Sequence, residues 1–282
     1  MTSEPILRGL RGKRVLITGA AKGQGYSHAL GFADAGCHVA LLDVTHAIDG
    51  VYAVATEELL TAAAREVSQR DVAVVVAPCD VREESDVADA VQRVYEAFDG
   101  VIDVVVNNAG IAALDPIHEM RTPVMNAIID TNLKGPIHVA KHTVGGMIAR
   151  RSGSIINISS AVTGGSGAML SHYVASKHAV NGLTIAWATE LAEFGIRVNA
   201  VCPGTIQPGI GHGSGMVAGL AEAIGSNPED AFEMFTERGG LPGAPWRLTA
   251  AEVTDAVLFL ASDNAAMMTG VILPVDGGHM AR

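Results

Sequence analysis

The segment YVASK places a tyrosine and a lysine four residues apart, at Tyr173 and Lys177. Side chains at positions i and i+4 share one face of a helix, so the phenol and the ammonium would be neighbours. A phenol has a pKa of about 10 and is a poor base at neutral pH, whereas a neighbouring positive charge favours the phenolate. The pair therefore predicts transfer of a proton to or from a substrate oxygen. Taken alone, the same spacing also fits a surface pair on a helix.

Three glycines, Gly19, Gly23 and Gly25, follow the apolar run RVLI and open a helical segment. At such a junction, backbone N–H groups and the helix dipole favour an anion. Glycines lack a Cβ, which lets a pyrophosphate approach the backbone. The pattern departs from GxGxxG because His28 stands at the third glycine position. A tight turn with positive φ would explain one glycine but not three, so we expect a dinucleotide here.

Asp43 ends the second apolar run, HVALLD, and lies 20 residues after Gly23. A carboxylate at this position accepts hydrogen bonds from ribose hydroxyls and repels a 2′-phosphate. The position therefore favours NAD(H) over NADP(H). Lys22 argues the other way because its ammonium would attract a phosphate, but Asp43 carries more weight since it would lie at the sugar itself.

Runs of Val, Ile and Leu alternate along the chain with helical stretches. Because each run is continuous, the runs predict strands buried on both faces of a mostly parallel sheet. The alternation predicts a single α/β domain over residues 1–282, a doubly wound Rossmann domain with a seven-stranded sheet, helices on both faces and ligands at the carboxyl ends of the strands. The predicted strands span 13–18, 38–43, 72–80, 102–110, 153–160, 196–204 and 270–278. The predicted helices span 26–36, 57–70, 84–99, 122–150, 172–194 and 250–262, and residues 205–246 are expected to be irregular.

The composition limits the classes of protein that the chain fits. Its 282 residues are 49% hydrophobic, enough for a large core, and its net charge of -11 argues against a nucleic-acid partner. No apolar run reaches the roughly 18 residues of a membrane-spanning helix, and the N-terminus lacks the apolar core of a signal peptide. The three cysteines form no CxxC pair and are expected to be free buried thiols in a reducing cytoplasm. No spacing suggests a metal site, and His28 and His172 are expected to be structural.

Eight short motifs occur in an order and spacing that resembles the short-chain dehydrogenase/reductase family, from Gly12 to Gly278. Each motif is weak alone, but the eight together are specific. The resemblance implies an enzyme that interconverts a secondary alcohol and its ketone with NAD(H). The motifs are TGAAKGQG (18–25), DV (80–81), NNAG (107–110), the asparagine of TNLKG (Asn132), ISS (158–160), YVASK (173–177), PG (203–204) and VDGG (275–278).

The same resemblance implies a catalytic set. Tyr173 would act as general acid and base beside Lys177, and Ser160 would hold the substrate oxygen. Asn132 would bend its helix and hold a water that links Lys177 to solvent. Ser159 alternates to the other face of its strand and is the weaker choice. Because Ser160 and Asn132 accompany the tyrosine and the lysine, a surface pair on a helix is disfavoured as their role.

For the cofactor, the resemblance implies that Asp80 and Val81 contact adenine. Ala109 and Gly110 would let the dinucleotide pass close to the backbone, and Ile206 would offer its backbone to the nicotinamide carboxamide. With the glycine turn and the acid of the second strand, the expected cofactor-binding set is Gly19, Lys22, Gly23, Gln24, Gly25, Asp43, Asp80, Val81, Asn108, Ala109, Gly110, Tyr173, Lys177, Pro203, Gly204 and Ile206.

Two segments give the chain its individual features. Residues 44–60 are longer than the family norm, and with GQGYSHA they resemble the mycofactocin-associated dehydrogenases, a group with carveol-dehydrogenase-like enzymes that act on cyclic or secondary alcohols. That subgroup implies a tightly bound NAD regenerated by an external redox carrier, mycofactocin; the alternative is an ordinary surface loop. Residues 205–246 resemble the family's substrate lid. Pro208 replaces the usual threonine there, and His212 is a candidate substrate contact.

Several alternatives stay open at the level of sequence. The lid contains apolar residues that fit either an apolar ligand or a piece of core: Met216, Leu220, Phe232, Met234, Phe235 and Trp246. Helices 122–150 and 172–194 carry more apolar positions than one buried stripe needs, and the resemblance implies a homotetramer. A non-catalytic NAD-binding sensor or scaffold is a second function, which the complete catalytic set disfavours. A reductase of lipid-like or acyl-carrier substrates is a third, which usually uses NADPH and is disfavoured by Asp43.

Overall fold

Seven strands form one sheet in the computed structural model, which describes residues 7–165, 167–207, 216–236 and 248–281. Their order is β3-β2-β1-β4-β5-β6-β7, and every neighbouring pair is parallel. The predicted seven-stranded, doubly wound sheet is confirmed. The strands are β1 (Arg14–Thr18), β2 (His38–Asp43), β3 (Val74–Pro78), β4 (Val104–Asn107), β5 (Gly153–Ile158), β6 (Ile196–Pro203) and β7 (Ile272–Val275).

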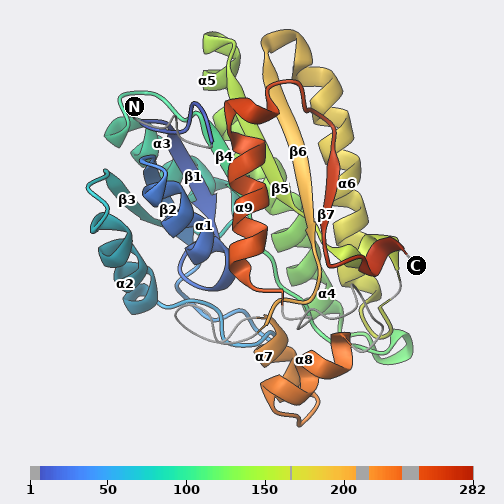
Figure 1. The fold of residues 1–282 in the computed structure, drawn as a ribbon. Coiled ribbons are helices and arrows are strands. Elements are labelled where there is room, and N and C mark those ends of the chain that lie inside the picture. Colours follow the sequence, from blue (N-terminus) through green and yellow to red (C-terminus); the bar gives the residue numbers. More distant parts are fainter. Residues whose placement is uncertain (1–6, 166, 208–215, 237–247, 282) are drawn as a thin grey trace, which may run out of the picture.

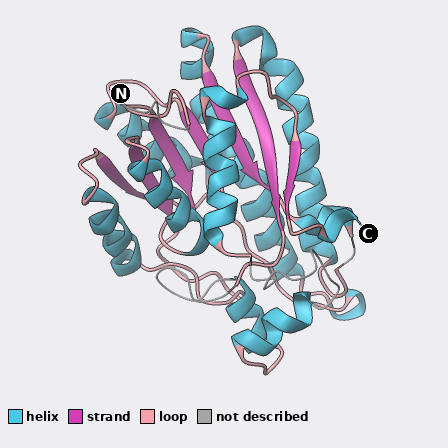
Figure 2. Ribbon diagram, viewed as in Figure 1, coloured by secondary structure: helices cyan, strands magenta, loops and turns pink. Residues whose placement is uncertain are grey.

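Helices cover both faces of this sheet (Figure 1, Figure 2). One layer is formed by α1 (Gly23–Asp34), α2 (Glu57–Ser68) and α9 (Ala250–Ala261). The other is formed by α3 (Glu84–Ala97), α5 (Gly135–Arg150) and α6 (Ser171–Leu191). Short 3-10 turns span Ile117–Glu119, Ala161–Gly164, Ala192–Phe194, Asp263–Ala265 and His279–Ala281.

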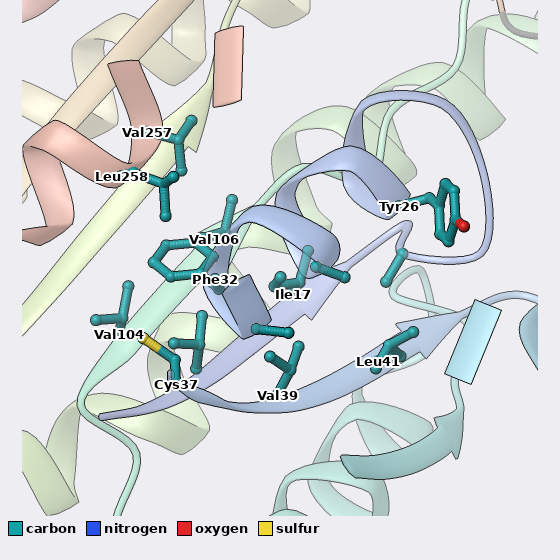
Figure 3. Close-up of a cluster of buried hydrophobic side chains, with 14 of the residues drawn as sticks. Ile17, Tyr26, Phe32, Cys37, Val39, Leu41, Val104, Val106, Val257 and Leu258 are labelled. Atoms are coloured by element: carbon teal, nitrogen blue, oxygen red, sulfur yellow. The ribbon is translucent and has the colours of Figure 1, made fainter. Parts of the chain in front are cut away.

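Continuous apolar side chains fill the space between the sheet and each helix layer. Figure 3 shows the ring of Phe32 from α1 among Ile17 and Val106 of the sheet and Val257 and Leu258 of α9. Phe32, Ile17 and Val106 have no exposed surface. Burial on both faces of the sheet explains why its strands read as unbroken apolar runs rather than as alternating patterns.

The direction of the chain reverses at the centre of the sheet. After β1 it moves outward to β2 and β3, then returns to β4 on the other side of β1. The arrowheads of all strands point to one edge, and the helices α7 (Met216–Ala223) and α8 (Pro228–Thr236) lie beyond that edge (Figure 1). A crevice at the reversal point of a parallel sheet is where ligands bind in such folds.

Local signals in the sequence fix several helix ends. Thr56 begins α2, and its hydroxyl accepts a hydrogen bond from the Leu59 amide at 3.3 Å, as expected. Glu57 and Glu58 occupy the first turn, where the helix dipole favours negative charge. At α9, Thr249 and Glu252 form a reciprocal capping box.

The expected single helix over 122–150 is divided. It consists of α4 (Thr122–Ile129), a π-helical segment (Asp130–Lys134) and α5. The π-helical segment contains Asn132, whose amide oxygen accepts a hydrogen bond from Ile111 N at 2.8 Å. A widened turn is the usual result when a side chain must reach out of a helix toward such a partner. The local bend that the resemblance implied at Asn132 is therefore present.

The expectation of an irregular segment over 205–246 is wrong where the structure describes it, because α7 and α8 are helices. Their apolar residues Val217, Ala221, Ala231 and Phe232 pack against one another. These helices are short and are flanked by Gly and Pro, so their periodicity is weak in the sequence. Pro208, His212 and Trp246 lie outside the described residues.

Two properties of the described chain bear on its environment. No helix in the described ranges is both long and apolar enough to span a membrane. The three cysteines are free and buried, as expected.

Candidate active site

The backbone conformation of the turn between β1 and α1 requires glycines. Gly19 and Gly23 have φ values of +66° and +56°, and a Cβ on Gly25 would lie 2.0 Å from the Gly19 carbonyl oxygen. The expectation that a tight turn would explain only one of the three glycines is therefore wrong. The site still fits an anion, because no described atom lies within 4 Å of the missing Cβ of Gly23. Lys22 is the N-cap of α1 and its side chain makes no capping hydrogen bond, so the first amides of the helix are available to an anion.

Hydrogen bonds fix this turn against the end of β4. The hydroxyl of Thr18 accepts hydrogen bonds from the amides of Asn108 at 3.1 Å and Ala109 at 3.0 Å. The Asn108 side chain donates to the carbonyls of Thr18 at 2.9 Å and Gly19 at 3.0 Å. Asn108 thus positions the turn, and the backbone from Ala109 to Gly110 forms the opposite side of the crevice.

Asp43 ends β2 beside the turn, and its carboxylate is 8% exposed. The carboxylate accepts a hydrogen bond from the Ala21 amide at 2.8 Å. Burial raises the pKa of Asp43 to about 6, although the amides of Ala21 and Val44 and the charge of Lys22 oppose the shift. A buried carboxylate held mainly by backbone amides retains acceptor capacity, which fits the hydroxyls of a ribose. In the glycine turn, the buried Oε1 of Gln24 has no hydrogen-bond partner among the described residues.

The side chain of Lys22 points away from the glycine turn and into the 44–60 segment. Its ammonium donates a hydrogen bond to the Ala53 carbonyl at 2.6 Å and lies 5.8 Å from the centroid of the Tyr52 ring. Both partners belong to the 44–60 segment, so this lysine anchors that segment. Because its ammonium is held by the 44–60 segment, Lys22 no longer argues for a bound 2′-phosphate and therefore for NADP(H).

Asp80 follows β3 and lies next to the end of β2, where the Cys79 amide donates to the Asp43 carbonyl at 2.9 Å. Its carboxylate is paired with the Arg82 guanidinium at 2.5 Å and lies 3.1 Å from His46 Nε2. Burial opposes ionisation of Asp80, but the hydrogen bonds and charge of Arg82 outweigh burial and lower its pKa. The Arg82 partner was not predicted, although a cation two residues after an acid in a turn is a local signal.

The structure brings Ser160, Tyr173 and Lys177 together at the carboxyl ends of the strands. Tyr173 and Lys177 are 7% and 3% exposed, and the lysine ammonium lies 5.7 Å from the centroid of the tyrosine ring. The ammonium donates to the Ile158 carbonyl at the end of β5, at 2.9 Å. The Ser160 hydroxyl accepts from the Val162 amide at 3.3 Å and hydrogen-bonds the Tyr173 phenol.

Burial acts on both members of the tyrosine–lysine pair. It raises the pKa of Tyr173 above its ordinary value of 10.0, although the hydrogen bond from Ser160 opposes the shift. It lowers the pKa of Lys177 to about 8. The lowered pKa expected for the phenol is therefore wrong for the chain alone, because loss of solvent outweighs the hydrogen bond from Ser160.

Asn132 connects the loop after β4 to the helix that contains the tyrosine. Its amide brackets Ile111, accepting from the backbone N–H at 2.8 Å and donating to the carbonyl at 2.9 Å. It also donates to the Ser176 hydroxyl at 3.0 Å, which in turn donates to the Tyr173 carbonyl at 2.7 Å. Ser176 was missed in the sequence, although it stands three residues after Tyr173. A Cβ on Gly110 would lie 3.2 Å from the Lys177 ammonium and 3.4 Å from Asn132 Oδ1, so the backbone at Gly110 passes close to both side chains.

Apolar side chains pack around Tyr173 in a cluster that we call the Tyr173 chamber. Its members are Ala112, Leu114, Val162, Leu170, Met216 and Leu220, the last two from α7. Phe232 instead packs within the α7–α8 pair. All three of these lid residues are seen in contacts within the chain, and contact with a ligand stays a prediction for Met216 and Leu220. Apolar packing around Tyr173 keeps water from its side chain, which is 7% exposed.

The remaining expected residues lie at the same edge. The Gly204 amide follows Pro203 at the end of β6 and donates to the Val275 carbonyl at 2.9 Å. Ile206 packs against the core under α1 and α9, so its backbone is held at this edge. Asn107, the first residue of the NNAG motif, donates to Asn157 at 2.9 Å and thereby joins β4 to β5.

The two histidines have structural partners, as expected. His28 is fully buried, and its Nδ1 lies 2.8 Å from the Thr254 hydroxyl, while burial lowers its pKa to about 3. Nδ1 of His172 accepts from the Tyr173 amide at 2.9 Å, and its Nε2 lies 3.8 Å from Asp115. Within the described ranges, no three metal-ligating side chains gather into a cluster.

Comparisons with known proteins agree with this geometry. A family model described as short chain dehydrogenase matches residues 13–215. The (-)-trans-carveol dehydrogenase of Rhodococcus erythropolis is 34% identical over 95% of this chain and 98% of its own length. Oxidoreductase UcpA of Escherichia coli is 37% identical over 95% of both chains. The crystal structure of carveol dehydrogenase from Mycobacterium avium in complex with NAD has a TM-score of 0.87 at 34% identity, covering 96% of this chain and 99% of that one.

The raised pKa of Asp43 predicts a cost in stability that depends on pH. Its folded-state pKa of about 6 exceeds the ordinary 3.8, so the penalty grows as pH rises from 3.8 to 6 and is complete above that range. We expect Asp43→Asn, which keeps an acceptor for the Ala21 amide, to raise the free energy of unfolding by roughly 1–3 kcal/mol at neutral pH. Urea unfolding should show this gain shrinking as the pH is lowered toward the ordinary pKa of the carboxyl.

The matched control is Asp99→Asn, which neutralises a carboxylate that is 90% exposed. We expect the control to change stability by no more than about 0.5 kcal/mol at either pH. A gain for Asp43→Asn that is equal at both pH values would contradict the burial of a charge at this position.

Proposed function

Because this chain belongs to the short chain dehydrogenase family, we propose that it interconverts a secondary alcohol and its ketone with NAD(H). The observation that carries the proposal is the buried group of Ser160, Tyr173 and Lys177 inside an apolar chamber. This group lies at the same edge of the sheet as the glycine turn and Asp43. Phosphate and ribose recognition and proton transfer would thus share one crevice.

Each residue of the group has a task that follows from its contacts. The Ser160 hydroxyl holds the substrate oxygen beside the phenol, and Tyr173 takes the proton of the alcohol or returns one to the ketone. Lys177, held by the Ile158 carbonyl, supplies the positive charge that favours the phenolate. Asn132 positions the loop at Ile111 and the helix at Ser176. The nicotinamide, when bound, accepts or donates the hydride.

The chain offers a matching set of contacts for the dinucleotide. The open amides of the glycine turn suit the pyrophosphate, and Asp43 suits the adenosine ribose. Asp80 and Val81 border the adenine side. We assign the cofactor to NAD rather than NADP because Asp43 is buried at the end of β2 and Lys22 points into the 44–60 segment. The carveol dehydrogenase from Mycobacterium avium was solved in complex with NAD.

Two other functions are less favoured. A non-catalytic NAD-binding sensor has no need of a buried, desolvated tyrosine–lysine pair in an apolar chamber. A reductase that uses NADPH would leave the Asp43 carboxylate against a 2′-phosphate, which is repulsive. For the substrate, the apolar lining supports a cyclic or otherwise hydrophobic secondary alcohol, the class to which the relative's name, (-)-trans-carveol dehydrogenase, points.

Removal of the phenol tests the catalytic assignment. Tyr173→Phe keeps the ring in the chamber but removes the group that exchanges the proton, so we expect turnover to fall by about 10²-fold or more. NAD binding, measured by fluorescence titration, should persist. The control Tyr95→Phe makes the same change where the hydroxyl bonds the Thr143 carbonyl at 2.9 Å, and its turnover should match wild type. Loss of less than about tenfold in Tyr173→Phe would remove Tyr173 from the mechanism.

We also propose that the 44–60 segment covers the adenosine half of the cofactor. It begins directly after Asp43, and its Ile48, Val51, Tyr52 and Val54 pack on the α4 region. A segment fixed in this way blocks an exit path and slows release, since differences in affinity mostly appear in the off-rate. The enzyme would then need an external carrier, such as mycofactocin, to regenerate NAD.

The cover predicts that NAD(H) co-purifies with the protein. Denaturing freshly purified protein and quantifying the released nucleotide should give close to one NAD(H) per subunit. Turnover with an artificial dye acceptor should exceed turnover with added NAD alone, because exchange is slow. Protein that is free of cofactor and turns over rapidly on added NAD would reduce the segment to an ordinary surface loop.

We propose that the chain forms a homotetramer through α5 and α6. Ile137 of α5 is 37% exposed and Ile185 of α6 is 54% exposed, and large apolar side chains on a surface favour a partner. Light scattering at micromolar concentration should give the mass of four chains, and Ile185→Asp should lower it. A monomeric wild-type protein would contradict this assembly.

We further place the protein in the cytoplasm. Three free, buried thiols are stable in a reducing compartment.

A further inference from the structure

Tyr52 lies where three parts of the molecule meet: the 44–60 segment, helix α7 and the Tyr173 chamber. The Lys22 ammonium lies over the Tyr52 ring, 5.8 Å from its centroid. The mechanism proposed above gives this tyrosine no task. In Figure 1 the light-blue trace after β2 passes close to α7, although the two are far apart in sequence.

Helix α7 packs directly against the ring of Tyr52. A Cβ on Gly219 would lie 2.3 Å from Cγ and 2.5 Å from Cβ of Tyr52. Only a glycine at this position lets the helix approach so closely. The neighbouring Leu220, and Met216 one turn earlier, belong to the apolar chamber around Tyr173. A shift of α7 at Gly219 therefore moves two walls of the chamber.

The hydroxyl end of Tyr52 points to the same chamber. The amide of Ala112, which itself packs against Tyr173, donates a hydrogen bond to the Tyr52 hydroxyl oxygen. Burial, and to a lesser degree the nearby Tyr173 phenol, raises the pKa of Tyr52, so its hydroxyl stays neutral. The Tyr52 ring therefore packs with the α4 region, and its hydroxyl bonds the backbone of a residue that contacts Tyr173.

The backbone that carries Tyr52 is held on its other side by the α4 region. Arg121 donates to the Gly50 carbonyl at 3.4 Å, and the same arginine is paired with the buried Asp115 at 2.7 Å. Gly50 packs so tightly that a Cβ there would lie 2.6 Å from Val124. These contacts hold the backbone two residues before Tyr52 and do not involve α7.

We propose that Tyr52 is a specificity-determining residue that couples the cofactor-side segment to the substrate lid. Helix α7 closes on its ring, and the ring sets how far Leu220 and Met216 stand from Tyr173. By holding α7 close to Tyr173, the ring favours small cyclic secondary alcohols over bulkier ones. The inference rests on the proposed dehydrogenase function for its substrate part, whereas the contact between Tyr52 and α7 is testable without turnover.

Two substitutions at Tyr52 separate the ring from the hydroxyl. In Tyr52→Ala the support of α7 is lost, so amide hydrogen exchange of residues 216–223 should become faster. The ratio of kcat/KM for a bicyclic secondary alcohol to that for cyclohexanol should rise by about tenfold or more. Tyr52→Phe keeps the ring and should leave the exchange of α7 unchanged. Tyr52→Ala with unchanged exchange and a ratio within about twofold of wild type would overturn the inference.

A second variant approaches the contact from the helix. Gly219→Ala places a methyl group into the Tyr52 ring, so α7 must move, and both its hydrogen exchange and the substrate ratio should change. Gly145→Ala adds the same methyl where no described atom lies within 4 Å, and both readouts should stay at wild-type values. Gly219→Ala that behaves like Gly145→Ala would also overturn the inference.

The two proposals fail in different ways. If wild-type protein oxidises no secondary alcohol, the proposed function fails, and the exchange of α7 in Tyr52→Ala still decides the contact. If wild type is active but neither Tyr52→Ala nor Gly219→Ala changes exchange or the ratio, only the role of Tyr52 fails.

Discussion

The hydroxyl of Thr18 joins the two strands between which the chain reverses direction. It accepts the amides of Asn108 and Ala109, at 3.1 and 3.0 Å, so the end of β1 and the loop after β4 are held together. The glycine turn is pressed onto that loop, because a Cβ on Gly19 would lie 2.9 Å from Ala109 Cα. The same loop continues to Gly110, which borders the Lys177 ammonium. One junction therefore links the anion-binding turn to the proton-transfer group.

Several ionisable side chains are buried at this edge of the sheet. Asp43 and Tyr173 have raised pKa values and Lys177 a lowered one, and burial is the largest cause in all three. Asp80 is buried as well, yet Arg82 pairs with it and its pKa falls. Asp80 thus differs from the other three groups in having a guanidinium as its ion-pair partner. Buried ionisable groups with shifted pKa values are typical of a binding or catalytic site.

The sequence predicted the parts of this molecule that depend on local pattern. Long apolar runs located all seven strands, and Thr56 marked the start of α2. The π-helical interruption depends on a hydrogen bond between Asn132 and Ile111, 21 residues apart, which helical periodicity does not contain. Helix α7 was missed because its stability comes from distant contacts, including the one between Gly219 and Tyr52.

Site residues followed the same division between local and non-local information. Motif spacing brought Ser160, Tyr173 and Lys177 to one place, since a strand end and a helix face are local features. The direction of the Tyr173 pKa was wrong because burial is set by the surrounding chain, including α7. For Lys22, the sequence suggested contact with a phosphate, but its ammonium bonds the Ala53 carbonyl. The path of the segment that contains Ala53 cannot be predicted from the sequence.

Hydride transfer at the Tyr173 chamber can be followed directly with an isotope. Purified protein, NAD⁺ and a panel of cyclic secondary alcohols deuterated at the carbinol carbon would be incubated, and the nucleotide analysed by mass spectrometry after denaturation. Deuterium in the reduced nicotinamide is the expected result, because the hydride passes from carbon to cofactor while Tyr173 takes the proton. Bound NAD that acquires no deuterium from any alcohol of the panel would contradict a dehydrogenase and favour an NAD-binding sensor on the same fold.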